Sequence, residues 1–125
     1  QLEMGMNGGY AELVYFRNEI VLASKLASIE APIDGVTVDI KNDELLKLET
    51  TQAKNLGFAA KLCIHPLQIE MVNRVFRPST TEVDWAKRVL DAVNAAQGQA
   101  ISLDGKMIDL PVIRRAEQVL QASVE

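Results

Sequence analysis

The stretch LGFAAKLCIHPLQI, residues 56–69, decides the fold, because it joins a helix end, a strand and a helix start. The Leu-Gly pair at 56–57 predicts the end of a helix, since glycine accepts the left-handed conformation of a helix C-terminus. Residues 58–64 form a short apolar run with one lysine, which is typical of a buried strand. The His-Pro pair at 65–66 predicts the next helix start, because proline suits the first helical turn.

A helix, a strand and a helix joined by short turns form the repeating unit of parallel α/β sheets and barrels. In such folds the chemistry lies where strands end and helices begin. His65 directly follows the expected strand, and Cys63 and Ile64 stand at the end of that strand. These three residues are therefore the first candidates for a functional site.

The composition is that of one soluble globular domain, with 125 residues, 48% hydrophobic and 24% charged, and a formal net charge of -4. No run reaches the roughly 18 apolar residues of a membrane helix, and no secretory signal is found. The acidic balance argues against duplex nucleic acid as a partner. The single cysteine, Cys63, excludes an internal disulfide, so we expect a reducing, cytoplasmic location. As a side chain, Cys63 is better explained as a buried small hydrophobe than as a reactive thiol.

Further helices and strands are expected around the central stretch. Residues 10–28 predict a helix and residues 33–38 a strand rich in β-branched residues. Asn42 or Asp43 caps the helix that ends at the Leu-Gly pair, and a short helix follows over 66–75. Helical spacing places these residues inward: Leu13, Phe16, Ile20, Ala27, Leu45, Leu46, Leu48, Ala53, Ile69, Val72 and Val75.

The remaining residues, 78–125, predict a helical arm. Ser79 and Glu82 have the spacing of a capping box, in which each residue satisfies a helix-start donor of the other. The helix that they begin ends at 97–98, where a Gln-Gly pair stands. Its inward residues at helical spacing are Val83, Ala86, Val89, Leu90 and Val93.

A hairpin and a last helix complete this arm. The Asp-Gly pair at 104–105 predicts a hairpin turn within residues 100–108, since both turn positions need positive φ. Asp109 then caps a helix over about 110–121, with Pro111 in its first turn.

Two strands cannot form a closed barrel, which needs eight, and they would leave long unpaired edges. Residues 1–77 therefore look like the last units of a larger α/β fold, with 78–125 as an appended arm. The chain begins with Gln1 rather than methionine, so we expect that an N-terminal part precedes it.

Asp109 is the strongest candidate for a catalytic residue. A carboxylate at a helix N-terminus just after a hairpin is held rigidly, and the helix dipole favours its charge. From spacing alone, a plain N-cap is the simpler explanation. His65, the one histidine of the chain, could act as a base or bind a substrate, and could equally cap the helix that follows.

Two aspartates, Asp34 and Asp39, flank the first expected strand. If the two strands are parallel, Asp39 lies at the same edge as His65, where carboxylates could hold Mg²⁺ through water or position a substrate. Asp39 is equally well explained as a loop cap. The sequence shows no spacing of metal-binding histidines or cysteines, no catalytic triad and no phosphate-binding glycine loop.

Three blocks carry a resemblance to a known family: YFRNEIVLASKLASIEAPIDGVTVDIKNDE (15–44), GFAAKLCIHPLQIEMVNRVFRPSTTEVDWAKRVLDA (57–92) and DGKMIDLP (104–111). With these blocks the chain resembles the citrate lyase beta subunit family, acyl-CoA lyases of the HpcH/HpaI aldolase superfamily. The resemblance is specific, because the motifs IHPxQI, FxPSxxEVxWA and GxMIDxP occur together in family order.

The resemblance implies a TIM (β/α)8 barrel, of which this chain supplies the last two βα units, followed by a C-terminal helix-hairpin-helix arm. It implies cleavage or formation of a C–C bond in a thioester of coenzyme A or of an acyl carrier, with an enolate held by Mg²⁺. The family's metal ligands lie on earlier strands, upstream of Gln1. We therefore expect no metal ligand in this chain and no activity of this chain alone.

The resemblance also assigns residues. Asp109 matches the aspartate of the family's MIDxP block, and would be a catalytic acid or base that the arm carries over a neighbouring subunit of a homotrimer or homohexamer. Cys63, Ile64 and His65 match the strand end that lines the thioester site.

Two alternatives stay open. One is a superfamily aldolase that acts on small oxo-acids without coenzyme A, although the DGKMIDLP block argues against it as a feature of the thioester branch. The other is a non-catalytic assembly fragment.

Overall fold

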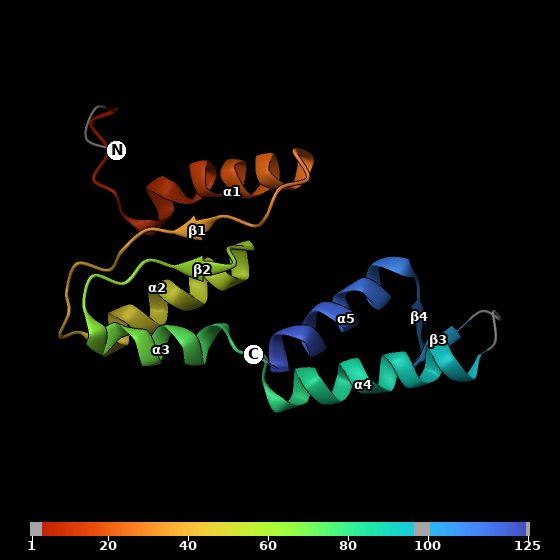
Figure 1. Ribbon diagram of the computed structural model, residues 1–125. Coiled ribbons are helices and arrows are strands. Elements are labelled where there is room, and N and C mark those ends of the chain that lie inside the picture. The colour runs from red at the N-terminus through yellow and green to blue at the C-terminus, as the bar shows by residue number, and fades with distance from the viewer. Residues whose placement is uncertain (1–3, 97–100, 125) are drawn as a thin grey trace. The chain divides into compact units, whose positions relative to one another are not determined.

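The computed structural model describes residues 4–96 and 101–124, and the chain divides into two compact units (Figure 1). Unit 1 extends to Phe76 and unit 2 begins at Arg77. No helix in the described part of the chain is long and apolar enough to cross a membrane. That unit 1 is a portion of a barrel and unit 2 its appended arm stays a prediction.

In unit 1 the described residues form helices and strands in alternation: α1 (Tyr10–Leu26), β1 (Ile33–Asp34), α2 (Asp43–Leu56), β2 (Ala60–Lys61) and α3 (Pro66–Phe76). β1 and β2 are parallel, with Ile33 opposite Ala60 (Figure 1). The parallel pairing agrees with the α/β prediction, and α3 begins at the predicted proline.

Both strands are shorter than the predicted ranges, 33–38 and 58–64, because the ladder covers two residues in each strand. Beyond β1 the backbone carbonyls bind side chains instead of a neighbouring strand. The carbonyl oxygen of Gly35 accepts a hydrogen bond from Lys61 Nζ at 2.8 Å, and a nearby carbonyl binds the amide of Gln68. Side chains thus satisfy backbone groups that a longer ladder would have paired.

Local signals set the helix ends. Gly57 adopts φ 101° and closes α2, as predicted. Of the two cap candidates for that helix, Asn42 is the cap, since its Oδ1 accepts a hydrogen bond from Leu45 N at 3.0 Å. α1 ends at Leu26, short of the prediction, because Ser28 adopts a left-handed φ of 54°.

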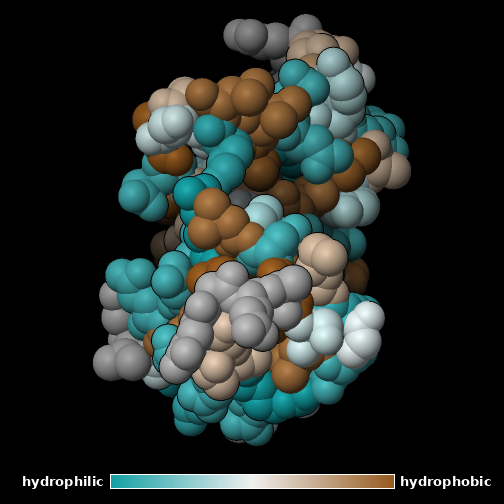
Figure 2. Space-filling view, turned by 90° about the vertical axis from the view of Figure 1, so that its right-hand side faces the viewer, coloured by the Kyte–Doolittle hydropathy of each residue, from teal (hydrophilic) through white to brown (hydrophobic). Residues whose placement is uncertain are grey.

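The buried apolar core of unit 1 is small, and α1 contributes little to it. The buried apolar side chains are Leu46, Ala53, Phe58 and Val72. Several residues predicted to face inward are exposed, and those predictions are wrong: Phe16, Ile20, Ala27, Leu48 and Ile69. Figure 2 shows hydrophobic side chains at the surface of the upper part of the molecule, where α1 lies. The apolar stripe of α1 therefore finds little cover among the described residues.

In unit 2 the described residues form α4 (Thr80–Ala95), β3 (Ile101–Leu103), β4 (Lys106–Ile108) and α5 (Leu110–Val124). α4 and α5 lie side by side, and β3 pairs with β4 as an antiparallel hairpin (Figure 1). The helix-hairpin-helix prediction is confirmed. The core of unit 2 is formed by Ala86, Val89, Ile108 and Ala116.

The predicted turn and cap signals act as expected in unit 2. The side chain of Ser79 accepts a hydrogen bond from Glu82 N at 3.2 Å, and Glu82 Oε2 accepts one from Ser79 N at 2.8 Å. Asp104 and Gly105 adopt φ 52° and 76° in the hairpin turn. The predicted helix end at 97–98 and the first residue of the predicted hairpin lie outside the described residues.

Candidate functional site

The loop that leaves β2 carries three predicted site residues, Cys63, Ile64 and His65. Cys63 is half-buried with a free thiol, and Ile64 is 52% exposed. His65 Nδ1 accepts a hydrogen bond from Leu67 N at 3.2 Å, and the His65 carbonyl oxygen accepts one from Gln68 N at 3.0 Å. His65 therefore caps α3, and a neutral ring that accepts at Nδ1 carries its proton at Nε2. Its role toward a substrate stays a prediction.

The loop that leaves β1 starts at the same sheet edge, because β1 and β2 are parallel. Asp39 caps a turn in this loop, since its Oδ1 accepts a hydrogen bond from Lys41 N at 3.0 Å. Gln68 joins the two loops: its Oε1 accepts from Ile64 N at 2.9 Å, and its Nε2 donates to the carbonyl oxygen of Thr37 at 2.9 Å. The parallel edge predicted from the sequence is thus present, with a glutamine between its two loops.

Unit 1 contains a buried charge network. Asp34 on β1 pairs with Arg17 of α1 at 2.8 Å and with Lys61 of β2 at 3.1 Å. Lys61 also lies 3.9 Å from Glu49, whose carboxylate accepts a hydrogen bond from the Thr37 hydroxyl. The Lys61 side chain is only 2% exposed. A buried ammonium group is tolerated there because carboxylates and a carbonyl oxygen surround it.

Arg17 has an unusual environment in this network. Its guanidinium carbon lies 5.8 Å from the ring centre of Tyr10 and 5.2 Å from that of Phe58, within range for cation–π attraction. Arg17 Nε is buried and has no hydrogen-bond partner among the described residues. Asp34, one of the two aspartates predicted to flank the first strand, is therefore occupied by Arg17 and a lysine rather than presented to a metal.

Mg²⁺ does not fit the described side chains. Within residues 4–96 and 101–124, no group of three or more His, Cys, Asp or Glu side chains could hold a metal ion. Asp34 and Glu49 are engaged by cations, and Asp39 caps its own turn. The hard oxygen ligands that Mg²⁺ requires are therefore not gathered at this edge.

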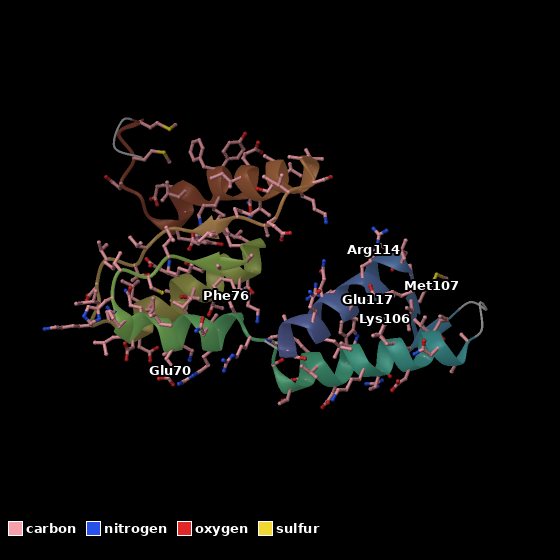
Figure 3. The ribbon with its side chains drawn as sticks, in the orientation of Figure 1. Glu70, Phe76, Lys106, Met107, Arg114 and Glu117 are labelled. Carbon is pink, nitrogen blue, oxygen red and sulfur yellow. The ribbon has the colours of Figure 1, made fainter. Side chains whose placement is uncertain are left out.

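Asp109 lies between β4 and α5 on unit 2. Its Oδ1 accepts a hydrogen bond from Val112 N at 3.2 Å and its carbonyl oxygen accepts one from Ile113 N at 3.1 Å, so it is the N-cap of α5. The side chain is exposed. The neighbouring side chains of Met107 and Arg114 point away from the body of unit 2 (Figure 3). The Asp109 carboxylate is thus both fixed by the helix start and open to solvent.

A second carboxylate fixes the hairpin. Arg88 Nη2 on α4 lies 2.5 Å from each carboxylate oxygen of Asp104 in the turn. The hydrogen bond to Asp104, and then its charge, raise the pKa of Arg88 above the usual value, so this guanidinium stays charged. The pair ties the turn to α4, and the hairpin in turn leads into the start of α5.

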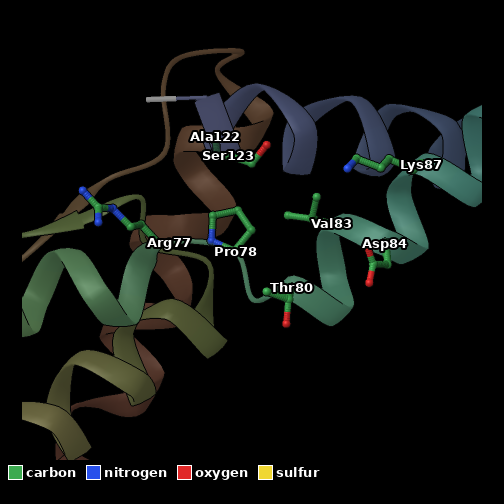
Figure 4. Close-up of a pocket in the computed structure, with 8 residues that line it drawn as sticks. All are labelled: Arg77, Pro78, Thr80, Val83, Asp84, Lys87, Ala122 and Ser123. Carbon is green, nitrogen blue, oxygen red and sulfur yellow. The ribbon is translucent and has the colours of Figure 1, made fainter.

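Each unit has a cavity in its surface. On unit 2, a cavity of about 540 Å³ lies between the start of α4 and the end of α5, with Arg77 and Lys87 in its lining (Figure 4). On unit 1, a cavity of about 580 Å³ is lined by residues of both strands and of α1 and α2, including Asp34 and Lys61. Neither cavity is lined by the β2 loop or by Asp109.

Sequence reasoning did not assign roles to three of these residues. Lys61 had a signal, since it is the one charged residue in the apolar run before His65. Gln68 stands in the IHPxQI motif, but nothing in the motif says that its amide joins two loops. Arg17 gave no signal, because helical spacing places it on the polar side of its helix.

Comparison with known proteins shows similarity along most of the chain. No family model matches it. A citrate lyase subunit beta of Haemophilus influenzae is 40% identical over 113 residues, which make up 88% of this chain and 38% of that protein. A mitochondrial citramalyl-CoA lyase of Rattus norvegicus is 31% identical over 112 residues, or 87% of this chain and 33% of that protein. The chain thus spans well under half the length of these curated relatives.

Solved structures show the same similarity in three dimensions. CitE of Mycobacterium tuberculosis, solved in complex with magnesium, acetoacetate and coenzyme A, matches with a TM-score of 0.76 and 37% identity. The match covers 89% of this chain and 41% of that one. Over the part of these relatives' length that it spans, the chain is similar to the citrate lyase beta subunit family in both sequence and structure.

Proposed function

We propose that the chain is part of a Mg²⁺-dependent C–C lyase or synthase that acts on a thioester of coenzyme A or of an acyl carrier. The observation that carries the proposal is the similarity to CitE, whose structure holds magnesium, acetoacetate and coenzyme A. The rat relative, named as a citramalyl-CoA lyase, supports the same reaction class. Since the chain covers 41% of CitE, the proposal concerns the activity of a longer protein.

Asp109 performs the proton transfer in this proposal. Breaking a C–C bond next to a thioester leaves an enolate, so a proton must be delivered or removed near the developing charge. The Asp109 carboxylate is exposed and held at the start of α5 by the Val112 N–H. That bond engages Oδ1, which leaves Oδ2 to take or deliver the proton.

The β2 loop lines the thioester in this proposal. Ile64 offers an exposed apolar side chain next to the polar backbone of the loop. His65 accepts at Nδ1, so a neutral ring can donate its Nε2 proton to a substrate oxygen. Cys63 stands between them and β2 as a small, half-buried side chain. Apolar contacts with a few placed polar groups are usual for such sites.

We place the Mg²⁺ ligands outside the described residues, upstream of Gln1, on further strands of a TIM barrel. When bound, the ion supplies charge stabilisation to the enolate oxygen. Two features of unit 1 support further strands. β1 and β2 pair only with each other among the described residues, and the apolar stripe of α1 is exposed. Parallel sheets are normally covered on both faces, so these surfaces suit a larger barrel.

An activity assay on the full-length protein tests the proposal. Hydroxyacyl thioesters of coenzyme A and of an acyl carrier would be offered with Mg²⁺, with EDTA, and with EDTA followed by excess Mg²⁺. We expect thioester-dependent C–C cleavage that EDTA abolishes and Mg²⁺ restores. Turnover of small oxo-acids without any thioester would instead establish the aldolase alternative.

We also propose that the protein is a homotrimer or homohexamer in which the arm serves a neighbouring subunit. Mixing subunits with Asp109→Asn and subunits with His65→Ala tests this arrangement. If the arm acts in trans, the mixture recovers activity that neither variant has, because some sites receive both native residues. No recovery at any mixing ratio would contradict the arrangement.

The free thiol of Cys63 fits a reducing, cytoplasmic location.

A non-catalytic assembly fragment is the second candidate. The described residues contain no cluster that could hold a metal ion, and both candidates expect this. Intact mass spectrometry of the native protein separates the candidates. The enzyme proposal expects a mass well above the 13.8 kDa of these residues. A native mass of that value would favour the assembly role.

A further inference from the structure

Gln68 lies at the start of α3 and is one of the most buried polar side chains of unit 1, with 1% of its surface exposed. Its amide makes two hydrogen bonds of 2.9 Å in opposite directions. The Oε1 atom accepts from Ile64 N in the loop after β2. The Nε2 atom donates to the carbonyl oxygen of Thr37 in the loop after β1.

Only an amide of this length serves both partners. One partner is a backbone donor and the other a backbone acceptor, and a glutamine carries an acceptor and a donor on one planar group. Thr37 is 31 residues from Gln68 in the sequence, so the bond is a long-range tie between loops. Buried polar groups that lose such partners are costly, because no water replaces the bond.

The tie extends into the charge network of unit 1. The Thr37 hydroxyl donates to Glu49, and Glu49 lies 3.9 Å from Lys61 on β2. Lys61 in turn donates to the carbonyl oxygen of Gly35, in the loop after β1, at 2.8 Å. The first residues after both strands are therefore held by one connected set of side chains, in which Lys61 and Gln68 are buried and Glu49 is partly exposed.

We propose that Gln68 is a positioning residue for the thioester site, because it fixes the Ile64 backbone of the β2 loop against the β1 loop. This inference rests on the proposed function, in which the β2 loop lines the thioester. Gln68 is nearly fully buried, so it acts through the loop and not by direct contact with a substrate. By holding the Ile64 backbone, it keeps the two residues beside Ile64, Cys63 and His65, at a constant distance from the β1 loop.

The expected consequence is a binding defect without a chemical defect. A displacement of about 1 Å at a binding loop can cost up to about 10²-fold in kcat/KM. Loss of uniform binding raises KM with kcat nearly unchanged, whereas loss of a catalytic group lowers kcat. The loop tie therefore predicts a change in KM and in thioester affinity, with a nearly normal kcat.

The test uses Gln68→Met in the full-length protein, because methionine has a similar volume and makes neither hydrogen bond. Thr50→Val is the matched control: Thr50 is fully buried in unit 1, and its hydroxyl donates to Leu46 O within α2 at 2.6 Å. Both variants lose buried hydrogen bonds, but only Gln68→Met removes the two bonds that connect the β2 loop to the β1 loop. Calorimetry with acetyl-CoA gives the affinity, and amide hydrogen exchange at Ile64 reports the tie.

We expect Gln68→Met to bind acetyl-CoA at least about tenfold more weakly, within the range that loop misplacement allows, and to exchange the Ile64 amide faster. Thr50→Val should match the wild type in both measurements. Equal acetyl-CoA affinity in Gln68→Met and the wild type, or an equal loss in Thr50→Val, would overturn the positioning role.

Two further outcomes are decisive. If Gln68→Met does not fold, Gln68→Asn replaces it, because the shorter amide cannot reach both loops. Gln68→Asn should weaken acetyl-CoA binding in the same way. Normal binding by this variant would overturn the positioning role. If the wild-type protein itself binds no acyl-CoA or acyl-carrier thioester, the proposed function fails and the positioning role fails with it. A wild type that binds while the Gln68→Met variant binds equally well contradicts the positioning role alone.

Discussion

Lys61 on β2 lies 3.1 Å from Asp34 on β1, and both side chains are nearly buried, with 2% and 11% of their surface exposed. The same carboxylate takes Arg17 at 2.8 Å, so two cations from different elements meet on one aspartate. The parallel strand pair is therefore held by charge as well as by its short ladder. Removing one partner of a buried pair leaves a charge that water does not solvate.

Lys61→Met should destabilise the full-length protein by about 3 kcal/mol, at the lower end for a broken buried pair because Arg17 still binds the carboxylate. Lys47→Met is the control, since Lys47 is exposed on α2 and has no ion pair among the described residues. Urea unfolding followed by circular dichroism measures both variants. Equal stability of Lys61→Met and Lys47→Met would show that the network does not hold the strands.

Gly57→Ala should destabilise the protein by about 1–2 kcal/mol, because φ 101° is costly for a residue with a Cβ atom. The added Cβ would also lie 3.0 Å from a methyl group of Val21. Gly35→Ala is the matched control, since a Cβ there meets nothing within 4 Å. Thermal unfolding should lower the midpoint for the first variant alone; a similar loss in both would contradict the role given to Gly57 as the end of α2.

Asp109→Ala should lower the free energy of unfolding by about 0.5–2 kcal/mol, because it removes the side-chain cap of α5. Asp109→Asn should leave stability nearly unchanged, since asparagine caps a helix as well as aspartate does. Chemical denaturation of the two variants separates the cap from the acid. An equal loss of stability in both would mean that the charge, rather than the cap, stabilises the helix start.

The parts of the fold that the sequence predicted depend on residues close together in the chain. Gly57 ends its helix through its own φ, and the Ser79 cap binds a residue three positions along. The hairpin turn follows from the positive φ of Asp104 and Gly105. Such interactions are local, so the identities of a few neighbouring residues are enough to predict them.

The parts that the sequence did not predict depend on residues far apart. Lys61 and Asp34 are 27 positions apart, and no periodicity brings them together. The prediction that one face of α1 packs inward was wrong for a related reason. Helical spacing predicts an apolar face, but not whether another element covers it, and Ile20 remains half-exposed. The role of Gln68 likewise requires the pairing of β1 with β2 to be known.

Turnover of the Asp109→Asn variant in the full-length protein tests the central claim most directly, because this change keeps the helix cap and removes the acid. With Mg²⁺ and an acyl thioester that the wild type cleaves, we expect kcat to fall by roughly 10²–10⁴-fold, the usual loss for a general acid or base. The unfolding midpoint should stay that of the wild type. A kcat equal to that of the wild type would contradict the assignment of Asp109 as the group that moves the proton.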